Sequence, residues 1–259
     1  MMIETYFLAL VLMLLVGCMF WLISIVKEDV SIVDSLWPIF FIIASVYFYL
    51  HLESPSLRAQ IITLLVLIWG ARLSAYITIR HWGHEEDHRY QKIRANNQPG
   101  FEFKSIYLIF GFQVVIAWFI SLPLFAATNS TNALGIIDWV GITLWFIGMF
   151  FEVVGDYQLW RFKRNPENHG KVLTTGLWRY TRHPNYFGEF LIWWGYFCFA
   201  LAANAYWTVL SPLLMSFLLL KFSGVGLLEQ TMKQRPGYEH YMRTTNAFFP
   251  GIFNRKLKS

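Results

Sequence analysis

The sequence predicts an all-α membrane protein with about seven transmembrane helices. Hydrophobic residues make up 56% of its 259 residues and charged residues only 14%, whereas an ordinary soluble domain carries about 25% charged residues. The apolar residues gather in runs of about 20 residues, the length that a helix needs to cross a hydrocarbon core about 30 Å thick. Basic residues gather between these runs. Together these observations indicate a polytopic helical bundle.

The predicted spans follow the order of the apolar runs. The first run lacks a basic start and a small-residue cleavage site, so we interpret it as a span and not as a signal peptide. The second run contains Asp34 near its start and Pro38 one turn later, and the third contains Arg72. The stretch Ala203-Asn204-Ala205 predicts a tight hairpin between the last two spans. The predicted spans are residues 6–26, 32–50, 60–79, 106–126, 134–154, 187–203 and 206–222.

The charges of the loops predict the orientation, because Lys and Arg accumulate on the cytoplasmic side of a membrane. Most basic residues lie in residues 80–104, in residues 156–189 and in the tail after Glu229, whereas residues 127–133 contain none. We therefore place these three basic regions in the cytoplasm, with the N-terminus outside and the C-terminus inside. The membrane is either a bacterial inner membrane or that of the endoplasmic reticulum. Without a linker or an internal repeat, residues 1–259 are expected to form one integral membrane domain.

Some familiar ligand patterns are weighed first. Cys18 and Cys198 both lie in apolar runs, so neither a disulfide framework nor a thiolate metal cage is expected. Residues 84–88, HEEDH, match the zinc pattern H-E-x-x-H. They lack a third ligand and a surrounding apolar helix, so a solvated charged loop is the better interpretation and no metal is expected. The net charge of +5 lies in a few loops, which favours an anionic small ligand and lipid headgroups over nucleic acid.

Asp34 and Arg72 lie inside predicted spans, where ionisable groups are costly and are often functional. Asp34 either has a functional role or caps the second helix at the interface. Arg72 either has a functional role or forms a structural ion pair with a buried acid. Both alternatives stay open for each residue.

Residues 156–189 form a polar, basic segment between apolar runs. Six cations face only three acids there, and the arginines offer planar forks that suit phosphate. Aromatic rings interleaved with these cations can stack on a base or a nicotinamide ring. The alternative is a juxtamembrane loop on lipid headgroups, with Trp178 and Tyr180 as interface anchors. The cations are Arg161, Lys163, Arg164, Lys171, Arg179 and Arg182, and the acids are Asp156, Glu167 and Glu189.

One run within this segment resembles a known family. Residues 176–189 read GLWRYTRHPNYFGE, with Asp156 upstream and RPGYEHY at residues 235–241 followed by Phe249-Pro250 downstream. This pattern resembles the membrane steroid 5-alpha-reductase family over about residues 152–250. Isoprenylcysteine carboxyl methyltransferases look similar in the Arg-His-Pro-x-Tyr-x-Gly core, and sterol reductases share the architecture. Asn185 with Glu189, the position of Asp156 and the Gly-Leu-Trp lead-in favour the reductases.

The resemblance implies a helical bundle with a cytoplasm-facing cavity that holds NADPH. It assigns the substrate to residues 1–126 and the cofactor to residues 134–259. By position, the cofactor site would be lined by Asp156, Lys163, Arg179, Asn185, Glu189 and Tyr241. Further candidates from the same motifs are Arg72, Arg164, Arg182, His183, Tyr186 and Tyr238. The implied substrate is a lipophilic enone, steroid-like or another lipid.

Reduction of such an enone needs a hydrogen-bond donor at the carbonyl oxygen, where negative charge develops. Desolvation at membrane depth is expected to keep Asp34 protonated and able to donate. Tyr76, one helical turn after Arg72, is a second candidate donor. The cofactor carries the hydride, while the protein supplies position and field.

Two rival functions remain. A methyltransferase that uses S-adenosylmethionine would employ a similar basic and aromatic pocket, but it needs no acid near the substrate carbonyl. A lipid-binding or scaffold membrane protein would use its basic loops on anionic headgroups. The number of cations around residues 161–182 favours a cofactor with several phosphates. The sequence indicates membrane lipids and a small lipophilic molecule as partners, and no protein partner is inferable.

Overall fold

The computed structural model describes residues 2–222, 226, 229 and 232–251, and these residues form helices and connecting loops without a strand. The chain divides into two compact units. Unit 1 comprises Met1–Gly135 with Phe199–Ser211, and unit 2 comprises Ile136–Cys198 with Pro212–Ser259. The return of residues 199–211 to the first unit is not apparent from the sequence.

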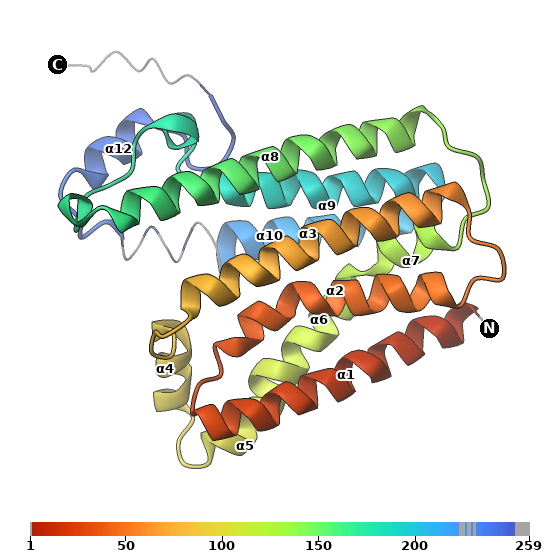
Figure 1. Ribbon diagram of the computed structural model, residues 1–259, viewed down its shortest axis with the longest axis horizontal. Coiled ribbons are helices and arrows are strands. Elements are labelled where there is room, and N and C mark those ends of the chain that lie inside the picture. Colours follow the sequence, from red (N-terminus) through yellow and green to blue (C-terminus); the bar gives the residue numbers. More distant parts are fainter. Residues whose placement is uncertain (1, 223–225, 227–228, 230–231, 252–259) are drawn as a thin grey trace. The chain divides into compact units, whose positions relative to one another are not determined.

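Unit 1 is built on three long helices, α1 (Met2–Lys27), α2 (Ile32–Leu50) and α3 (Leu57–His81), which lie side by side (Figure 1). The apolar residues of α2 pack inward, with Phe40 and Phe41 fully buried. Gly70 lets α3 approach α2 closely, because a Cβ there would lie 2.8 Å from Ile42 Cγ1 and 3.2 Å from the Pro38 carbonyl oxygen.

The fourth predicted span differs from the structure at both ends. A helix runs from Phe101 to Ile120 instead of from residue 106 to residue 126. Gly100 starts it with a left-handed backbone (φ 78°), and Pro123 lies at the start of the next short helix because it lacks the N–H that a helix interior requires. The parts are α5 (Phe101–Ser105), a π-helical turn (Ile106–Gly111), α6 (Phe112–Ile120) and α7 (Leu122–Thr128). A short polar helix, α4 (His88–Asn96), precedes them.

Unit 2 is organised around the antiparallel helices α8 (Ile136–Arg164) and α9 (Pro184–Ala202), shown in green and cyan (Figure 1). The helix α8 continues to Arg164, beyond residue 154 where the fifth span is predicted to end. Three basic residues lie in its last turn, where they favour the negative end of the helix dipole. Unit 2 also contains most of α10 (Leu210–Phe217), a π-helical turn (Leu218–Phe222) and α12 (Tyr238–Thr244).

The class of a polytopic helical membrane bundle is confirmed. Among the described helices, five are long and apolar enough to span a membrane: Ile3–Lys27, Ile32–Leu50, Leu57–His81, Phe101–Ile120 and Ile136–Arg164. The sixth and seventh predicted spans correspond to α9, with 19 residues, and to the shorter apolar helix Tyr206–Lys221, so the number seven stays a prediction. The predicted turn at Asn204 is confirmed, with φ 61° at that residue. Both cysteines are free.

Candidate functional site

In unit 1, the Asp34 carboxylate is held by two residues of α4. Tyr90 donates its hydroxyl to Asp34 Oδ1 at 2.5 Å, and Arg89 donates from a terminal guanidinium nitrogen to Oδ2 at 2.6 Å. The Tyr90 hydroxyl accepts a bond from Gln113 Nε2 at 3.1 Å, and Arg89 Nε donates to Asp87 Oδ1 at 2.9 Å. We call these five residues the Asp34 cluster. It links α2, α4 and α6.

This geometry tests the expected capping role of Asp34. The capping interpretation is wrong, because the N-cap residue of α2 is Ser31 and the Asp34 oxygens bond to side chains instead. Asp34 was also expected to donate a hydrogen bond. In the structure Asp34 accepts one from Arg89, because a guanidinium has only donors. The hydroxyl that the structure brings to Asp34 belongs to Tyr90. The ring of Tyr76, the other expected donor, lies 5.3 Å from the Arg72 guanidinium and 5.6 Å from that of Arg80.

The electrostatics of this cluster keep protons on Tyr90 and Arg89. Burial raises the pKa of the Tyr90 phenol well above its usual value, and the Asp34 charge and hydrogen bond raise it further. Burial lowers the pKa of Arg89, but Asp34 and Asp87 together raise it above its usual value. Tyr90 is only 6% exposed, so its hydroxyl is a neutral hydrogen-bond donor shielded from water.

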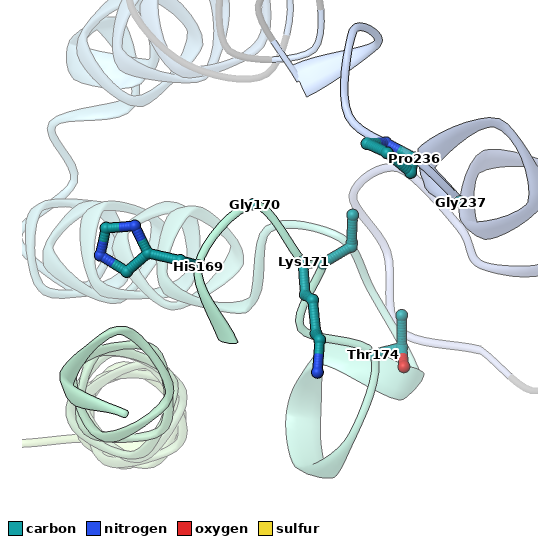
Figure 2. A pocket seen from close by; sticks show the side chains of 7 residues that line it. His169, Gly170, Lys171, Thr174, Pro236 and Gly237 are labelled. Carbon is teal, nitrogen blue, oxygen red and sulfur yellow. The ribbon is translucent and has the colours of Figure 1, made fainter. Parts of the chain in front are cut away.

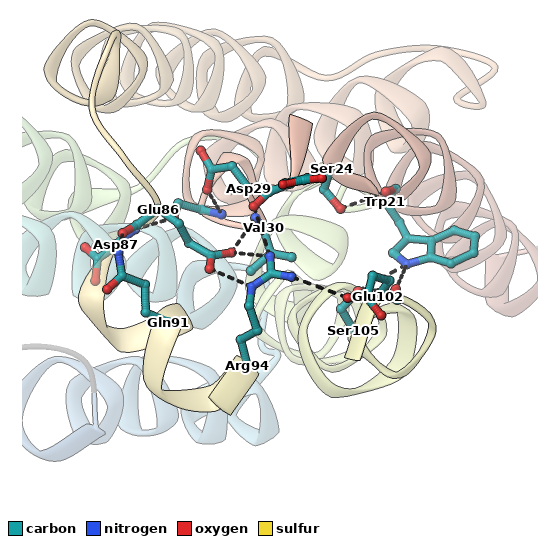
Figure 3. A network of polar contacts seen from close by, with 12 residues as sticks. Trp21, Ser24, Asp29, Val30, Glu86, Asp87, Gln91, Arg94, Glu102 and Ser105 are labelled. Atoms are coloured by element: carbon teal, nitrogen blue, oxygen red, sulfur yellow. Dashed lines mark hydrogen bonds and ion pairs between the residues drawn. The ribbon is translucent and has the colours of Figure 1, made fainter. Parts of the chain in front are cut away.

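A second network fastens the start of α4 to the connection between α1 and α2 (Figure 3). Glu86 accepts two bonds from Arg94, each of 2.8 Å, and one of 3.0 Å from the Val30 amide. Asp29 lies 3.1 Å from His81 Nε2. The Asp87 amide donates to the Ser31 hydroxyl at 2.8 Å, and the Asp87 carboxylate caps α4.

These contacts show how the residues of the zinc-like pattern at 84–88 are used in the structure. The helix α4 begins only at His88, so His84 and His88 do not share one helical face. Glu86 and Asp87 are used to hold α4. The solvated-loop interpretation is incomplete here, because both acids are only partly exposed.

The acids of this network predict a loss of stability in acid. Burial raises the pKa values of Asp29 and Asp87, but bonds from Ser31 and His81 to the first and from Arg89 to the second lower both below their usual values. A lowered folded-state pKa contributes stability above the unfolded value of about 4 and loses it as the pH falls through the folded value. We therefore expect the thermal midpoint of the protein in detergent to decrease when the pH is lowered below about 4, because Asp29 and Asp87 then become protonated.

The variant Asp87→Asn isolates this effect, because asparagine still caps a helix but carries no charge. Its midpoint should already be lower at pH 7, and its pH profile should be flatter in acid than that of the wild type. Glu85→Gln, at an exposed carboxylate, serves as the control. Parallel profiles for Asp87→Asn and the wild type would contradict this assignment.

In unit 2, close packing of α8 against α9 brings the second polar group together. A Cβ at Gly148 would lie 2.6 Å from the Gly188 carbonyl oxygen, and one at Gly188 would lie 2.5 Å from the Gly148 carbonyl oxygen. Only glycines permit this approach of two backbones. Asp156 lies about two turns after Gly148 on α8, and Asn185 lies about one turn before Gly188 on α9. Asn185 Nδ2 donates to Asp156 Oδ1 at 3.1 Å.

Asp156 and Glu189 are both buried, at 3% and 7% exposure. Glu189 Oε1 accepts a bond of 2.8 Å from the Trp193 indole. Asn185 Oδ1 accepts from the Tyr186 amide at 3.1 Å, so the carboxamide is oriented from both sides. Glu152, one turn before Asp156, is also buried and was not among the predicted residues. The structure therefore brings the buried Asp156 and the partly exposed Asn185 together between α8 and α9.

Several other predicted cofactor residues serve as structural clamps. Arg182 is 7% exposed and donates to Glu229 Oε1 at 2.6 and 2.8 Å, and to the carbonyl oxygens of Met242 and Thr245 at 3.1 and 2.5 Å. The Tyr241 hydroxyl donates to the Trp178 carbonyl oxygen. These bonds tie α12 and the following residues to the turn before α9, so Arg182 and Tyr241 both have partners within the protein.

His183 belongs to the same clamp. Its Nε2 lies 3.4 Å from Glu229 Oε1, and its ring stacks on that of Tyr186 at 5.6 Å. Burial raises the pKa of Glu229, but hydrogen bonds and charge from His183 and Arg182 together hold it below its usual value. Tyr238 is buried on α12, and burial raises the pKa of its phenol to about 12. The predicted cations Lys163, Arg164 and Arg179 are exposed.

A surface cavity of about 380 Å³ lies in unit 2. Figure 2 shows the loop of residues 169–174 on one side and Pro236 with Gly237 on the other. Arg235 donates to the Lys171 carbonyl oxygen at 3.4 Å, which links the two sides. The cavity is lined by His169, Gly170, Lys171, Val172, Thr174, Pro236 and Gly237.

Sequence reasoning missed Arg89, Tyr90, Gln113 and Glu229. Arg89 and Tyr90 lie in a polar stretch that reads as a solvated loop, and Gln113 lies in an apolar run. One signal was available in the sequence. Tyr90 is an aromatic residue in a short polar stretch without an apolar face, so its ring is expected to pack against another part of the chain.

The described helices define an integral membrane protein of the polytopic helical class. Residues 20–245 match the family described as "Protein of unknown function (DUF1295)", and the chain belongs to this family. It is similar to "Uncharacterized protein C594.04c" of Schizosaccharomyces pombe, with 29% identity over 96% of this chain and 80% of that protein. No solved structure matches the chain. Neither description names an activity.

Proposed function

We propose that the protein reduces a carbon–carbon double bond conjugated to a carbonyl group in a lipophilic substrate, with NADPH as the reductant. The observation that carries the proposal is the buried Tyr90 hydroxyl on Asp34. A hydride added to an enone leaves negative charge on the carbonyl oxygen, and a desolvated neutral donor stabilises such charge. Methyl transfer to a carboxylate or thiol has no use for this group.

The residues of unit 2 support the cofactor assignment in part. Asp156, Asn185 and Glu189 offer carboxylate and carboxamide groups suited to ribose hydroxyls and to the nicotinamide carboxamide. The exposed Lys163, Arg164 and Arg179 offer charge for phosphates. Arg182, His183 and Tyr241 would contribute indirectly. Their polar atoms bond to other parts of the protein and hold the backbone next to the cofactor residues in place.

NADPH would supply the hydride. The chain's own part is to hold the carbonyl oxygen at a donor, to keep that donor protonated and to exclude water. Burial of Tyr90 and the charge of Asp34 keep the phenol proton in place, while Arg89 offsets the Asp34 charge at 2.6 Å. The Asp34 cluster thus revises the sequence-based assignment. Tyr90 carries the donor proton, which its hydroxyl gives to Asp34 in this structure and would turn to the carbonyl oxygen when substrate binds.

The alternative remains a methyltransferase of the isoprenylcysteine carboxyl type, supported by the Arg-His-Pro-x-Tyr-x-Gly core at residues 182–188. Its cofactor, S-adenosylmethionine, carries no phosphate. The two functions therefore differ in whether exposed cations such as Arg179 contribute to cofactor affinity.

Variants of the Asp156 region test the cofactor assignment. Asn185→Ala removes the bond to Asp156, and Glu189→Gln removes a charge while its remaining carbonyl oxygen can still accept from Trp193. We expect each to weaken NADPH binding roughly 10- to 100-fold, the effect of a lost hydrogen bond to a charged or buried group. The measurement is the dissociation constant of NADPH for the purified protein in detergent.

Glu85→Gln provides the matched control, because it makes the same carboxylate-to-amide change at an exposed position of unit 1. Its NADPH affinity should equal that of the wild type. Wild-type affinity in both Asn185→Ala and Glu189→Gln would remove these residues from the cofactor site.

A further inference from the structure

The last two turns of α8 carry an exposed aromatic and basic surface. The rings of Tyr157 and Trp160 stack at 6.0 Å and are 54% and 45% exposed. The Arg164 guanidinium lies 4.9 Å from the Trp160 ring centroid, and Arg161 is exposed beside them. We call Tyr157, Trp160, Arg161 and Arg164 the α8 basic surface.

The length of α8 places this surface at the edge of a membrane. With 29 residues and a rise of 1.5 Å per residue, α8 is about 43 Å long, whereas the hydrocarbon core is about 30 Å thick. Its exposed apolar side chains, among them Trp139, Phe146 and Phe150, precede the α8 basic surface and require the hydrocarbon. The final turns therefore extend into the headgroup layer, where Trp and Tyr are enriched.

The charge of this stretch is of one sign. Residues 157–166 contain Arg161, Lys163 and Arg164 and no acidic residue. Arginine presents a planar fork that binds a phosphate through two parallel hydrogen bonds, and the Trp160 ring supports the Arg164 fork. Exposed rings and forks together match a lipid phosphate held at the depth of the glycerol backbone.

We propose that the α8 basic surface binds the phosphate-bearing headgroup of an anionic phospholipid. The lipid tails lie along the apolar side of α8, and Arg161 and Arg164 contact the phosphate. Each arginine near an anionic surface contributes roughly a fivefold preference for anionic over zwitterionic lipid. Arg164 is also a candidate for the cofactor phosphates, whereas Arg161 is not, so Arg161→Gln tests the lipid site apart from the proposed reductase activity.

Lipid retention measured by native mass spectrometry tests the proposal. The full chain is purified in mild detergent with equal amounts of phosphatidylglycerol and phosphatidylcholine of the same acyl chains. We expect the wild type to retain phosphatidylglycerol preferentially. Arg161→Gln should reduce the preference roughly fivefold and Arg161→Gln with Arg164→Gln roughly 25-fold. Arg161→Lys should keep most of it, because it keeps the charge.

Lys92→Gln is the control, because it removes an exposed cation from α4 in unit 1 and should leave the preference unchanged. Equal retention of both lipids by the wild type would overturn the proposal, as would an unchanged preference in the double variant with a wild-type thermal midpoint. Displacement of phosphatidylglycerol by millimolar inorganic phosphate would also overturn it, because the surface would then be a site for a soluble phosphate. A lowered preference for phosphatidylglycerol in Lys92→Gln would show that the preference depends on the net charge of the protein and not on the α8 basic surface. This result would likewise overturn the proposal.

Discussion

Changing Tyr90 to phenylalanine should lower the turnover number for enone reduction by about 10²- to 10³-fold, the usual effect of removing one oxyanion donor. The ring remains buried, so packing changes little, and only the hydroxyl between Asp34 and Gln113 is lost. Affinity for NADPH should stay within about twofold, because the cofactor residues lie on α8 and α9 and the donor acts on developing charge. Single-turnover reduction of an enone, with NADPH absorbance as the readout, measures this effect.

Two further tyrosines make the test specific. Tyr107→Phe, at a 60% exposed ring, is the control for loss of a phenol as such. Tyr76→Phe tests the donor expected from the sequence, whose ring lies against Arg72 and Arg80. A larger loss of turnover in Tyr76→Phe than in Tyr90→Phe would contradict the assignment of the donor to Tyr90.

A methyl group at Gly188 should destabilise unit 2 by about 3 kcal/mol, the upper part of the range for overpacking. The added Cβ would lie 2.5 Å from the Gly148 carbonyl oxygen and 2.8 Å from the Glu152 amide nitrogen. Because these are backbone atoms, α8 and α9 must separate. We expect the thermal midpoint of Gly188→Ala to fall by roughly 10 °C and NADPH binding to weaken, since the contact of Asp156 with Asn185 depends on this packing.

Gly17→Ala is the matched control in unit 1. Its added Cβ would have the Val114 Cγ2 atom at 3.1 Å, a side-chain atom that can move, so its thermal midpoint should fall much less. Equal midpoints for Gly188→Ala and the wild type would show that the two helices do not need this close approach.

The sequence predicted the helical membrane class well because long apolar runs have one stable form in lipid. The second span, residues 32–50, coincides with α2. The ends of other helices were less predictable, because they depend on local chemistry that hydropathy does not detect. Pro123 divides the fourth span, and α8 extends to Arg164 because basic residues suit a helix C-terminus.

The candidate site was predictable only where its residues are close in the chain. Asn185 and Glu189 share one turn of α9, which begins at Pro184. Tyr90 could not be assigned to Asp34, because 56 residues separate them and nothing in hydropathy pairs a polar helix with an acid on another helix. The ion pair of Arg182 was equally unpredictable, because its acid partner, Glu229, is 47 residues away.

Identification of the bound nucleotide tests the central claim most directly. The protein is purified in mild detergent and divided into two samples. One sample is denatured, and any released small molecule is identified by mass spectrometry. The other stays folded and is titrated with NADPH and with S-adenosylmethionine. The reductase account predicts released NADPH or its oxidised form, together with selective binding of NADPH. Selective binding of S-adenosylmethionine would contradict it and would move Asp156, Asn185 and Glu189 into a methyl-transfer site.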